Sequence, residues 1–232
     1  MTVVLYERMA ALYVIATPIG NLEDMTLRGL RILREVDAIL CEDTRVTAKL
    51  LSFYEISKPL IRCDEAAEEK AAHRAIELLS EGQSLALVSD AGTPGVSDPG
   101  SRLVRAVRDA GYAVVPVPGA SALTAALSVA GLDGHEFLFL GFLPHKKGRQ
   151  TALKAIAAEE RPVILYESPH RIEKLMSELT THAPEKSVTL FRELTKLYEE
   201  TLVGTPQELW ARLETDGNAR GEFVVVVAPG GE

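Results

Sequence analysis

The sequence predicts an α/β protein of two domains, with a mainly parallel sheet in the first domain and a mixed sheet in the second. Two observations lead to this prediction. In the first half of the chain, short apolar runs rich in β-branched residues alternate with segments of helical period, which is typical of parallel α/β structure. From about residue 120 such runs follow one another with fewer helices between them, which favours a mixed sheet.

The first domain is expected to cover residues 11–118. Its strands are predicted near residues 11–16, 35–41, 84–89 and 112–117. The clearest helix follows Asp98-Pro99, where an aspartate is placed to cap the helix and a proline suits its first position. Gly111 can close this helix in a left-handed conformation.

The second domain is expected to cover residues 119–232. The boundary between the domains is expected at residues 116–119, where two prolines disfavour a helix. Its strands are predicted near residues 136–141, 161–166, 186–191, 198–203 and 222–228. One helix should start at Ser168-Pro169, and another at the capping box formed by residues 205–208. We expect the last two strands, which have one helix between them, to run antiparallel.

Composition excludes several classes of protein. The chain has 232 residues, of which 47% are hydrophobic and 25% charged, as in a globular enzyme rather than a fibre or a disordered segment. Its net charge of −8 provides no global attraction to DNA or to a membrane. Cys41 and Cys63 have no nearby histidine at a ligand spacing, so we expect no disulfide scaffold and no metal. Neither a membrane-spanning run nor a signal peptide is present, which predicts a cytoplasmic protein.

Three glycine-containing turns follow predicted strands, where parallel sheets place their ligands. They span residues 17–21, 89–100 and 118–122. The lysine of a phosphate-binding loop is missing and no G-x-G-x-x-G follows a strand, so ATP, GTP and dinucleotides are poorly supported. Any one of these turns alone could be purely structural, whereas three in one chain favour a binding site.

Seven segments in the same order carry a resemblance to a known family. They are Thr17–Leu22, Glu42–Arg45, Ser89–Pro94, Ser97–Gly100, Gly141–Pro144, Tyr166–Ser168 and Arg192–Lys196. Together they resemble the small-subunit ribosomal RNA methyltransferases of the tetrapyrrole methylase superfamily. The resemblance implies two α/β domains with S-adenosylmethionine in the cleft between them, and a homodimer. It also implies methyl transfer to the ribose 2′-hydroxyl of a cytidine in the decoding region of 16S rRNA, in free RNA or in the small ribosomal subunit. Members usually continue into a C-terminal helical extension beyond the point where this sequence stops.

The implied cofactor agrees with the chemistry of the turns. Main-chain groups of small-residue loops can hold the adenine, ribose and methionine parts of S-adenosylmethionine without a lysine clamp. The resemblance places twelve residues against this cofactor. They are Pro18, Asp90, Ala91, Gly92, Gly95, Val96, Ser121, Ala122, Tyr166, Glu167, Glu193 and Leu194. For Tyr166, an ordinary aromatic residue at a strand end is the competing interpretation.

Candidate catalytic residues follow the predicted strand that ends at Cys41. Glu42, Asp43 and Arg45 should emerge at the same carboxyl edge as the turns at residues 17–21 and 89–100. Asp43 could orient a ribose hydroxyl or accept its proton, while Arg45 holds a flanking phosphate. Alternatively, Asp43 caps a helix that begins near Thr44 and pairs with Arg45.

A basic segment is the candidate contact with RNA. No acidic residue occurs between Phe137 and Ala158, and Lys146, Lys147 and Arg149 cluster around Gly148. Such a loop could bind phosphates even on an acidic protein, although it could equally be a solvated loop. Two rival functions stay open: a methyltransferase for a tetrapyrrole precursor, and a non-catalytic nucleotide-binding module.

Overall fold

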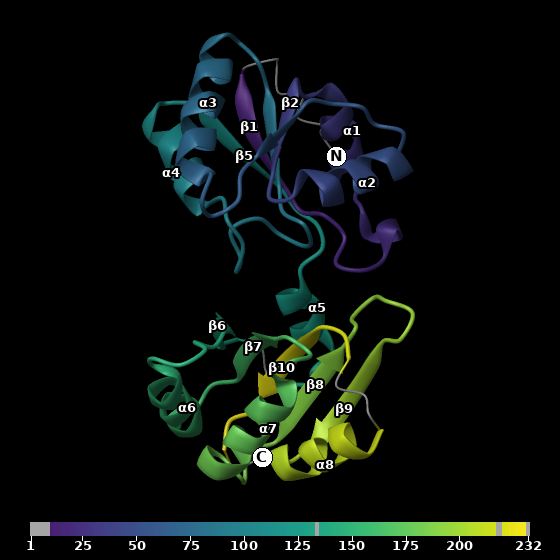
Figure 1. Ribbon diagram of the computed structural model, residues 1–232, viewed down its shortest axis with the longest axis vertical. Helices are drawn as coiled ribbons and strands as arrows, with labels where there is room; N and C mark the ends of the chain where they lie inside the picture. The colour runs from purple at the N-terminus through teal and green to yellow at the C-terminus, as the bar shows by residue number, and fades with distance from the viewer. Residues whose placement is uncertain (1–9, 133–134, 217–219, 231–232) are drawn as a thin grey trace. The chain divides into compact units, whose positions relative to one another are not determined.

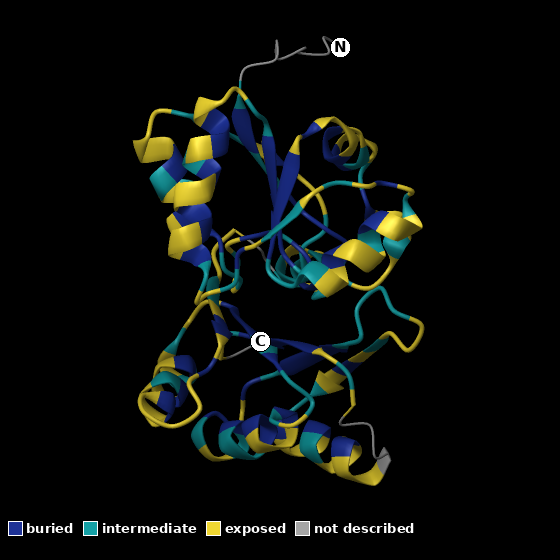
Figure 2. Cartoon of the chain, turned by 45° about the horizontal axis from the view of Figure 1, so that its top comes forward, coloured by how far each residue is buried: buried dark blue, intermediate teal, exposed yellow. Residues whose placement is uncertain are grey.

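The computed structural model describes residues 10–132, 135–216 and 220–230. The chain divides into two compact units, Met1–Ser121 and Ala122–Glu232. Each unit is built on one five-stranded sheet covered by helices (Figure 1). Buried residues lie in the strands and on the inner sides of the helices, and the helices expose their outer sides (Figure 2).

The first sheet is entirely parallel, with strand order β3-β2-β4-β1-β5. Its strands are β1 (Ala11–Ile15), β2 (Ala38–Cys41), β3 (Leu60–Arg62), β4 (Leu85–Val88) and β5 (Ala113–Val117). The four strands expected from the sequence are therefore confirmed. The fifth, β3, is an edge strand of three residues and was not predicted.

Helices cover both faces of this sheet. They are α1 (Leu27–Glu35), α2 (Thr44–Phe53), α3 (Glu68–Ser80) and α4 (Ser101–Asp109), with a short 3₁₀ turn η1 (Leu22–Asp24) before α1. Apolar residues of α3 and α4 pack with one face of the strands, and those of α1 and α2 with the other. Because both faces are buried, β2 and β4 are apolar throughout.

Helix α4 begins differently from the sequence prediction. Asp98 does not cap it: the N-cap is Gly100, and no side chain of that residue can serve. The cap comes instead from Glu68 at the start of α3, whose Oε1 accepts the N–H groups of Gly100, Arg102 and Leu103 at 2.9, 2.8 and 3.2 Å. A carboxylate here satisfies the unpaired N–H groups and interacts favourably with the helix dipole. Gly111 does follow the helix with a positive φ of 86°, as expected.

The second sheet is mixed, with strand order β6-β7-β10-β8-β9. Its strands are β6 (Leu138–Phe142), β7 (Val163–Glu167), β8 (Val188–Arg192), β9 (Glu200–Gly204) and β10 (Phe223–Val227). Strand β6 pairs parallel to β7, and the other three pairings are antiparallel. The mixed sheet is confirmed, but β9 and β10 are not antiparallel partners. Each pairs antiparallel to β8, which lies between them, so the two run in the same direction.

Helices of the second unit are α5 (Ala122–Val129), α6 (Arg149–Ala158), α7 (Ile172–His182) and α8 (Pro206–Asp216). Residues of α6, α7 and α8 pack on one face of the sheet, and α5 packs on the other. The capping box before α8 is confirmed, because Thr205 Oγ1 accepts the N–H of Glu208 and the Glu208 carboxylate accepts the N–H of Thr205. Helix α7 begins at Ile172, after a turn at Ser168, and not at Ser168 itself.

Candidate functional site

The three glycine-containing turns meet at the carboxyl edge of the first sheet. Thr17 and Gly92 form an isolated antiparallel bridge, with N–H···O distances of 2.8 and 3.0 Å. The Thr93 hydroxyl donates to the carbonyl of Ala120 at 3.1 Å, which joins the second turn to the third. Three turns that are separate in the sequence, the first about seventy residues before the second, thus form one local structure, as the position rule for parallel sheets predicts.

Backbone conformation explains why glycine occupies this structure. Gly92 has a φ of +79°, and a Cβ there would lie 3.3 Å from Ile19 Cγ2. Gly95 has a φ of +82° with no heavy atom within 4 Å of an added Cβ, so its backbone can be approached from outside. Of the other expected cofactor residues in this unit, Pro18 is buried, Ala91 is exposed, and Val96 and Ser121 are half-buried.

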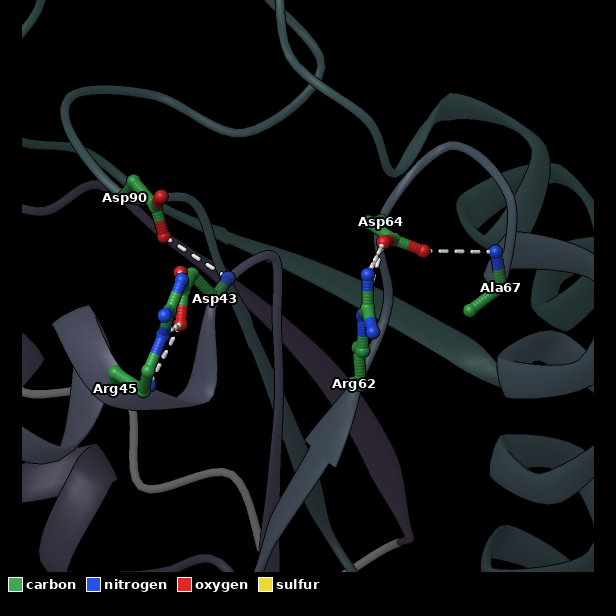
Figure 3. A network of polar contacts seen from close by, with 6 residues as sticks. All are labelled: Asp43, Arg45, Arg62, Asp64, Ala67 and Asp90. Atoms are coloured by element: carbon green, nitrogen blue, oxygen red, sulfur yellow. Dashed lines mark hydrogen bonds and ion pairs between the residues drawn. The ribbon is translucent and has the colours of Figure 1, made fainter.

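Asp43 caps helix α2. Its Oδ1 accepts the N–H of Arg45 at 2.8 Å, and its carboxylate pairs with the Arg45 guanidinium, with Nε 3.0 Å from Oδ1 (Figure 3). These hydrogen bonds from Arg45 lower the pKa of Asp43 far below its ordinary value. The capping interpretation is therefore confirmed as a structural role. The pair remains exposed on the Arg45 side, where 86% of the side chain is accessible.

Three further carboxylates, those of Glu42, Asp90 and Asp98, occur on the segments that follow β2 and β4. We call these three and Asp43 the carboxylate edge. Asp90 Oδ1 accepts the backbone N–H of Asp43 at 3.0 Å, which links the end of β2 to the end of β4 (Figure 3). Burial, followed by the charge of Asp90, raises the pKa of Glu42. Burial raises the pKa of Asp98 to about 6, with the charge of Glu42 adding to the shift. The edge thus holds more negative charge than its surroundings neutralise.

Two residues of this region were missed from the sequence. Asp98 had been assigned to capping α4, so its position among the other carboxylates was not foreseen. Asp64 follows β3, where its carboxylate pairs with Arg62 and accepts the N–H of Ala67 at 2.9 Å (Figure 3). The only signal for Asp64 was an apolar pair, Leu60-Ile61, too short to indicate a strand.

In the second unit, the expected cofactor residues lie at the ends of β7 and β8. Tyr166 packs with Leu194 on the face that carries α5, and its hydroxyl accepts the N–H of Leu123 at 3.0 Å. Tyr166 therefore also helps to hold the start of α5. Glu193 has a φ of +53°, and its Oε1 accepts hydrogen bonds from Lys196 Nζ and from the N–H of Glu222.

Two predicted roles in this unit need correction. Arg149 is only 3% exposed, and its Nε donates to Glu178 at 2.8 Å, so its side chain is not free to contact RNA phosphates. The side chain of Glu167 is fully buried and pairs with Arg171 at 3.2 Å. Only the backbone of Glu167 is available to a cofactor. Lys146 and Lys147 are exposed, as expected.

Both cysteines are free and buried. Cys41 belongs to the apolar cluster on one face of the first sheet and Cys63 to the cluster on the other. Among the residues that the structure describes, no group of three or more His, Cys, Asp or Glu could hold a metal ion. Within the same residues, no helix is both long and apolar enough to cross a membrane.

A family model for tetrapyrrole (corrin/porphyrin) methylases matches residues 11–209. The chain belongs to the tetrapyrrole methylase family. Its members include curated proteins named ribosomal RNA small subunit methyltransferase I. The one from Neisseria meningitidis serogroup B is 49% identical over 94% of this chain and 76% of its own length. The one from Coprothermobacter proteolyticus is 45% identical over 95% of this chain and 99% of its own length.

Solved structures agree on the fold. A crystal structure of diphthine synthase superposes with a TM-score of 0.74 at 18% identity, covering 94% of this chain and 90% of that one. At this identity the likeness concerns the fold alone. The tetrapyrrole methylase architecture expected from the sequence is thereby confirmed.

As a member of this family, the chain is a methyltransferase that uses S-adenosylmethionine as methyl donor. The residues at the carboxyl edge of the first sheet fit this cofactor. Gly92 leaves space that a Cβ would fill, and the Gly95 backbone is open. The sulfonium and ammonium of S-adenosylmethionine are cationic, and a cation beside the carboxylate edge would stabilise the ionised forms of Glu42 and Asp98, whose pKa values are raised by burial and, secondarily, by neighbouring carboxylates.

Proposed function

We propose that this enzyme methylates the ribose 2′-hydroxyl of a cytidine in the decoding region of 16S rRNA. The observation that carries the proposal is the 49% identity, over 94% of the chain, to a protein named ribosomal RNA small subunit methyltransferase I. A relative of nearly the same length as this chain has the same name. No other substrate has comparable support, because the solved tetrapyrrole methylases share only about a fifth of the sequence.

The three glycine-containing turns would hold the cofactor. Their contacts are assigned to Pro18, Asp90, Ala91, Gly92, Gly95, Val96 and Ser121 of the first unit and to Ala122, the first residue of the second. In the second unit the assignment comprises Tyr166, Glu193, Leu194 and the backbone of Glu167. Bound S-adenosylmethionine supplies an electrophilic methyl group on sulfur. The chain contributes mainly alignment of the ribose oxygen with that group, which by itself lowers the barrier substantially.

The carboxylate edge would act on the acceptor. As the ribose oxygen forms its bond to the methyl carbon, the hydroxyl proton must pass to a base. Asp43 is held by Arg45 and has a lowered pKa, which suits it to orienting the hydroxyl by a hydrogen bond. Glu42 has a raised pKa and is the stronger base, so it suits accepting the proton. Arg45, with its largely exposed side chain, would contact the flanking phosphate.

RNA must bind to a locally basic part of the surface, because the whole chain carries a net charge of −8. Lys146 and Lys147 are exposed in a segment without acidic residues and would contact phosphates. We expect the enzyme to act in the cytoplasm as a homodimer, on free 16S rRNA or on the small ribosomal subunit, and without a membrane or DNA partner.

The test is methyl transfer with tritiated S-adenosylmethionine and small ribosomal subunits or free 16S rRNA from cells that lack the enzyme. We expect label in 16S rRNA at one cytidine, and the linkage after that nucleotide should resist alkali because the 2′-oxygen is blocked. Label in another RNA, or at a base, would contradict the proposed substrate. Cofactor binding without transfer to either RNA sample would favour a binding module, and transfer to a tetrapyrrole precursor would favour the small-molecule rival.

A further inference from the structure

Two arginine side chains donate hydrogen bonds to the backbone of the segment that carries Lys146 and Lys147. We call residues 143–149 the basic loop. Arg149 Nη1 donates to the carbonyl of Pro144 at 3.2 Å, and Arg171 Nη2 donates to the carbonyl of Leu143 at 2.6 Å. Arg171 Nη1 also lies 3.3 Å from Nε2 of His145. Both arginines thus contact the start of the loop, on the N-terminal side of the two lysines.

A fully buried carboxylate lies between these arginines. Glu167 Oε1 pairs with Arg171 Nε at 3.2 Å and accepts the N–H of Ser168 at 3.0 Å. Its Oε2 is 3.9 Å from Arg149 Nη2 and has no hydrogen-bond partner. Glu178 completes the network through Arg149, at 2.7 Å from Nη2. One glutamate therefore attracts both of the arginines whose side chains donate hydrogen bonds to the basic loop.

Such a network is poorly explained by stability alone. Burying charges carries a desolvation cost that their attraction often fails to recover, and apolar side chains of similar volume commonly do as well. The Glu167 Oε2 atom of this network lacks a hydrogen bond, which adds to the cost. What the ions provide that apolar groups cannot is directed hydrogen bonding to the carbonyls of Leu143 and Pro144.

We propose that Glu167, Arg149 and Arg171 are positioning residues that fix the basic loop so that Lys146 and Lys147 contact RNA phosphates together. The inference rests on the proposed RNA substrate. Phosphates are spaced regularly along a strand, so two neighbouring lysines on a fixed loop lose less side-chain and backbone freedom on binding than two on a mobile loop. The network thus acts on RNA affinity without touching RNA.

Arg171→Lys is the most informative variant. It keeps a positive charge beside Glu167, but a single ammonium cannot satisfy Glu167, the Leu143 carbonyl and His145 at once, as the guanidinium does. Glu167→Gln is the second variant, since it retains the size of the side chain and removes its charge. Glu68→Gln is the matched control, because it alters a buried glutamate of the other unit.

The experiment measures RNA affinity against salt concentration for each variant, with and without Lys146→Ala/Lys147→Ala. In the wild-type background, removing both lysines should weaken binding roughly tenfold and reduce the salt slope by about 1.4–1.8. In Arg171→Lys and Glu167→Gln, removing both lysines should change RNA affinity less than about threefold, because the lysines already contribute little to RNA binding in these variants. In Glu68→Gln the full lysine effect should persist. The Michaelis constant for RNA should rise, while kcat at saturating RNA stays near the wild-type value for Arg171→Lys.

Each outcome decides a different point. A full lysine effect in folded Arg171→Lys overturns the positioning role and leaves the RNA substrate intact. If removing the lysines leaves the RNA affinity of the wild type unchanged, both the RNA contact of the basic loop and the positioning role are wrong. The proposed substrate is then still tested separately, by methylation of 16S rRNA. Loss of the lysine effect in Glu68→Gln as well would mean that general destabilisation, not this network, controls the loop.

Discussion

Each unit buries one glutamate beneath a surface that we assign to function, and the two are satisfied differently. Glu68 is 3% exposed, and one of its oxygens accepts three backbone N–H groups at the start of α4. Glu167 is 2% exposed and faces two arginine side chains, one at 3.2 Å and one at 3.9 Å. The first is held by main chain, which cannot move without unfolding a helix end. The second accepts one backbone N–H, that of Ser168 at 3.0 Å, and its other partners are arginine side chains, which can move.

The difference indicates what each surface requires. The loop of residues 89–100 ends at Gly100, so Glu68 fixes one end of a loop that must keep its backbone shape around a small ligand. The basic loop must present lysines to a larger and more variable partner. The charge network binds the carbonyls of Leu143 and Pro144, and so fixes the backbone of the loop that carries the two exposed lysines.

The largest effect is expected at Glu68. Glu68→Ala leaves three N–H groups without an acceptor, two of them in buried hydrogen bonds, and should lower the free energy of unfolding by about 3–5 kcal/mol. Glu68→Gln keeps a neutral acceptor and should cost about 1–2 kcal/mol. Urea unfolding measures both. Equal losses for Ala and Gln would show that the charge, and not the acceptor, holds α4.

Asp98 should give an intermediate effect of opposite sign, in the loop that Glu68 closes. Its pKa of about 6 in the folded chain exceeds the ordinary 3.8, so the folded state binds the extra proton and ionised Asp98 opposes folding above about pH 6. Asp98→Asn should therefore raise the free energy of unfolding at about pH 8 by roughly 1–2 kcal/mol, discounted for solvent screening. Below about pH 4 the gain should vanish, because Asp98 is then protonated in both states. Urea midpoints at the two pH values test this, and a gain that persists in acid would contradict it.

The strands and the cap of α4 show which features of the fold could be predicted from the sequence and which could not. Apolar runs rich in β-branched residues predicted nine of the ten strands in the described part of the chain. Strand β3 has three residues at a sheet edge, half-buried or exposed, so its pattern is too short to detect. The cap of α4 was misassigned because the nearest aspartate in sequence was chosen, while the acceptor lies thirty-two residues away.

Local signals predicted the site better than long-range ones. The meeting of the turns at Thr17 and Gly92 followed from the parallel topology, and the capping role of Asp43, one of two alternatives, followed from its position before a helix expected near Thr44. The burial of Arg149 did not follow, because its partners Glu178 and Glu167 come from later elements. In a run of basic residues, sequence alone gives no indication of which one is paired within the fold.

The smallest stability effect is expected at Asp43, a carboxylate that is partly exposed and caps α2 from its own chain position. Asp43→Asn retains an oxygen for the N–H of Arg45 and should leave the urea midpoint near the wild-type value, whereas Asp43→Ala loses the cap and should lower the midpoint by a small, measurable amount. Methyl transfer separates this structural role from the proposed one. If Asp43 orients the ribose hydroxyl as an anion, Asp43→Asn should slow single-turnover methylation at least tenfold while its urea midpoint stays near the wild-type value. If Asp43→Asn transfers methyl at the wild-type rate and Asp43→Ala only loses stability, Asp43 is a cap alone. Glu42 would then keep its proposed role as proton acceptor, with Asp98 as the alternative, since their raised pKa values make each a stronger base than Asp43, and the group that orients the hydroxyl would be sought elsewhere.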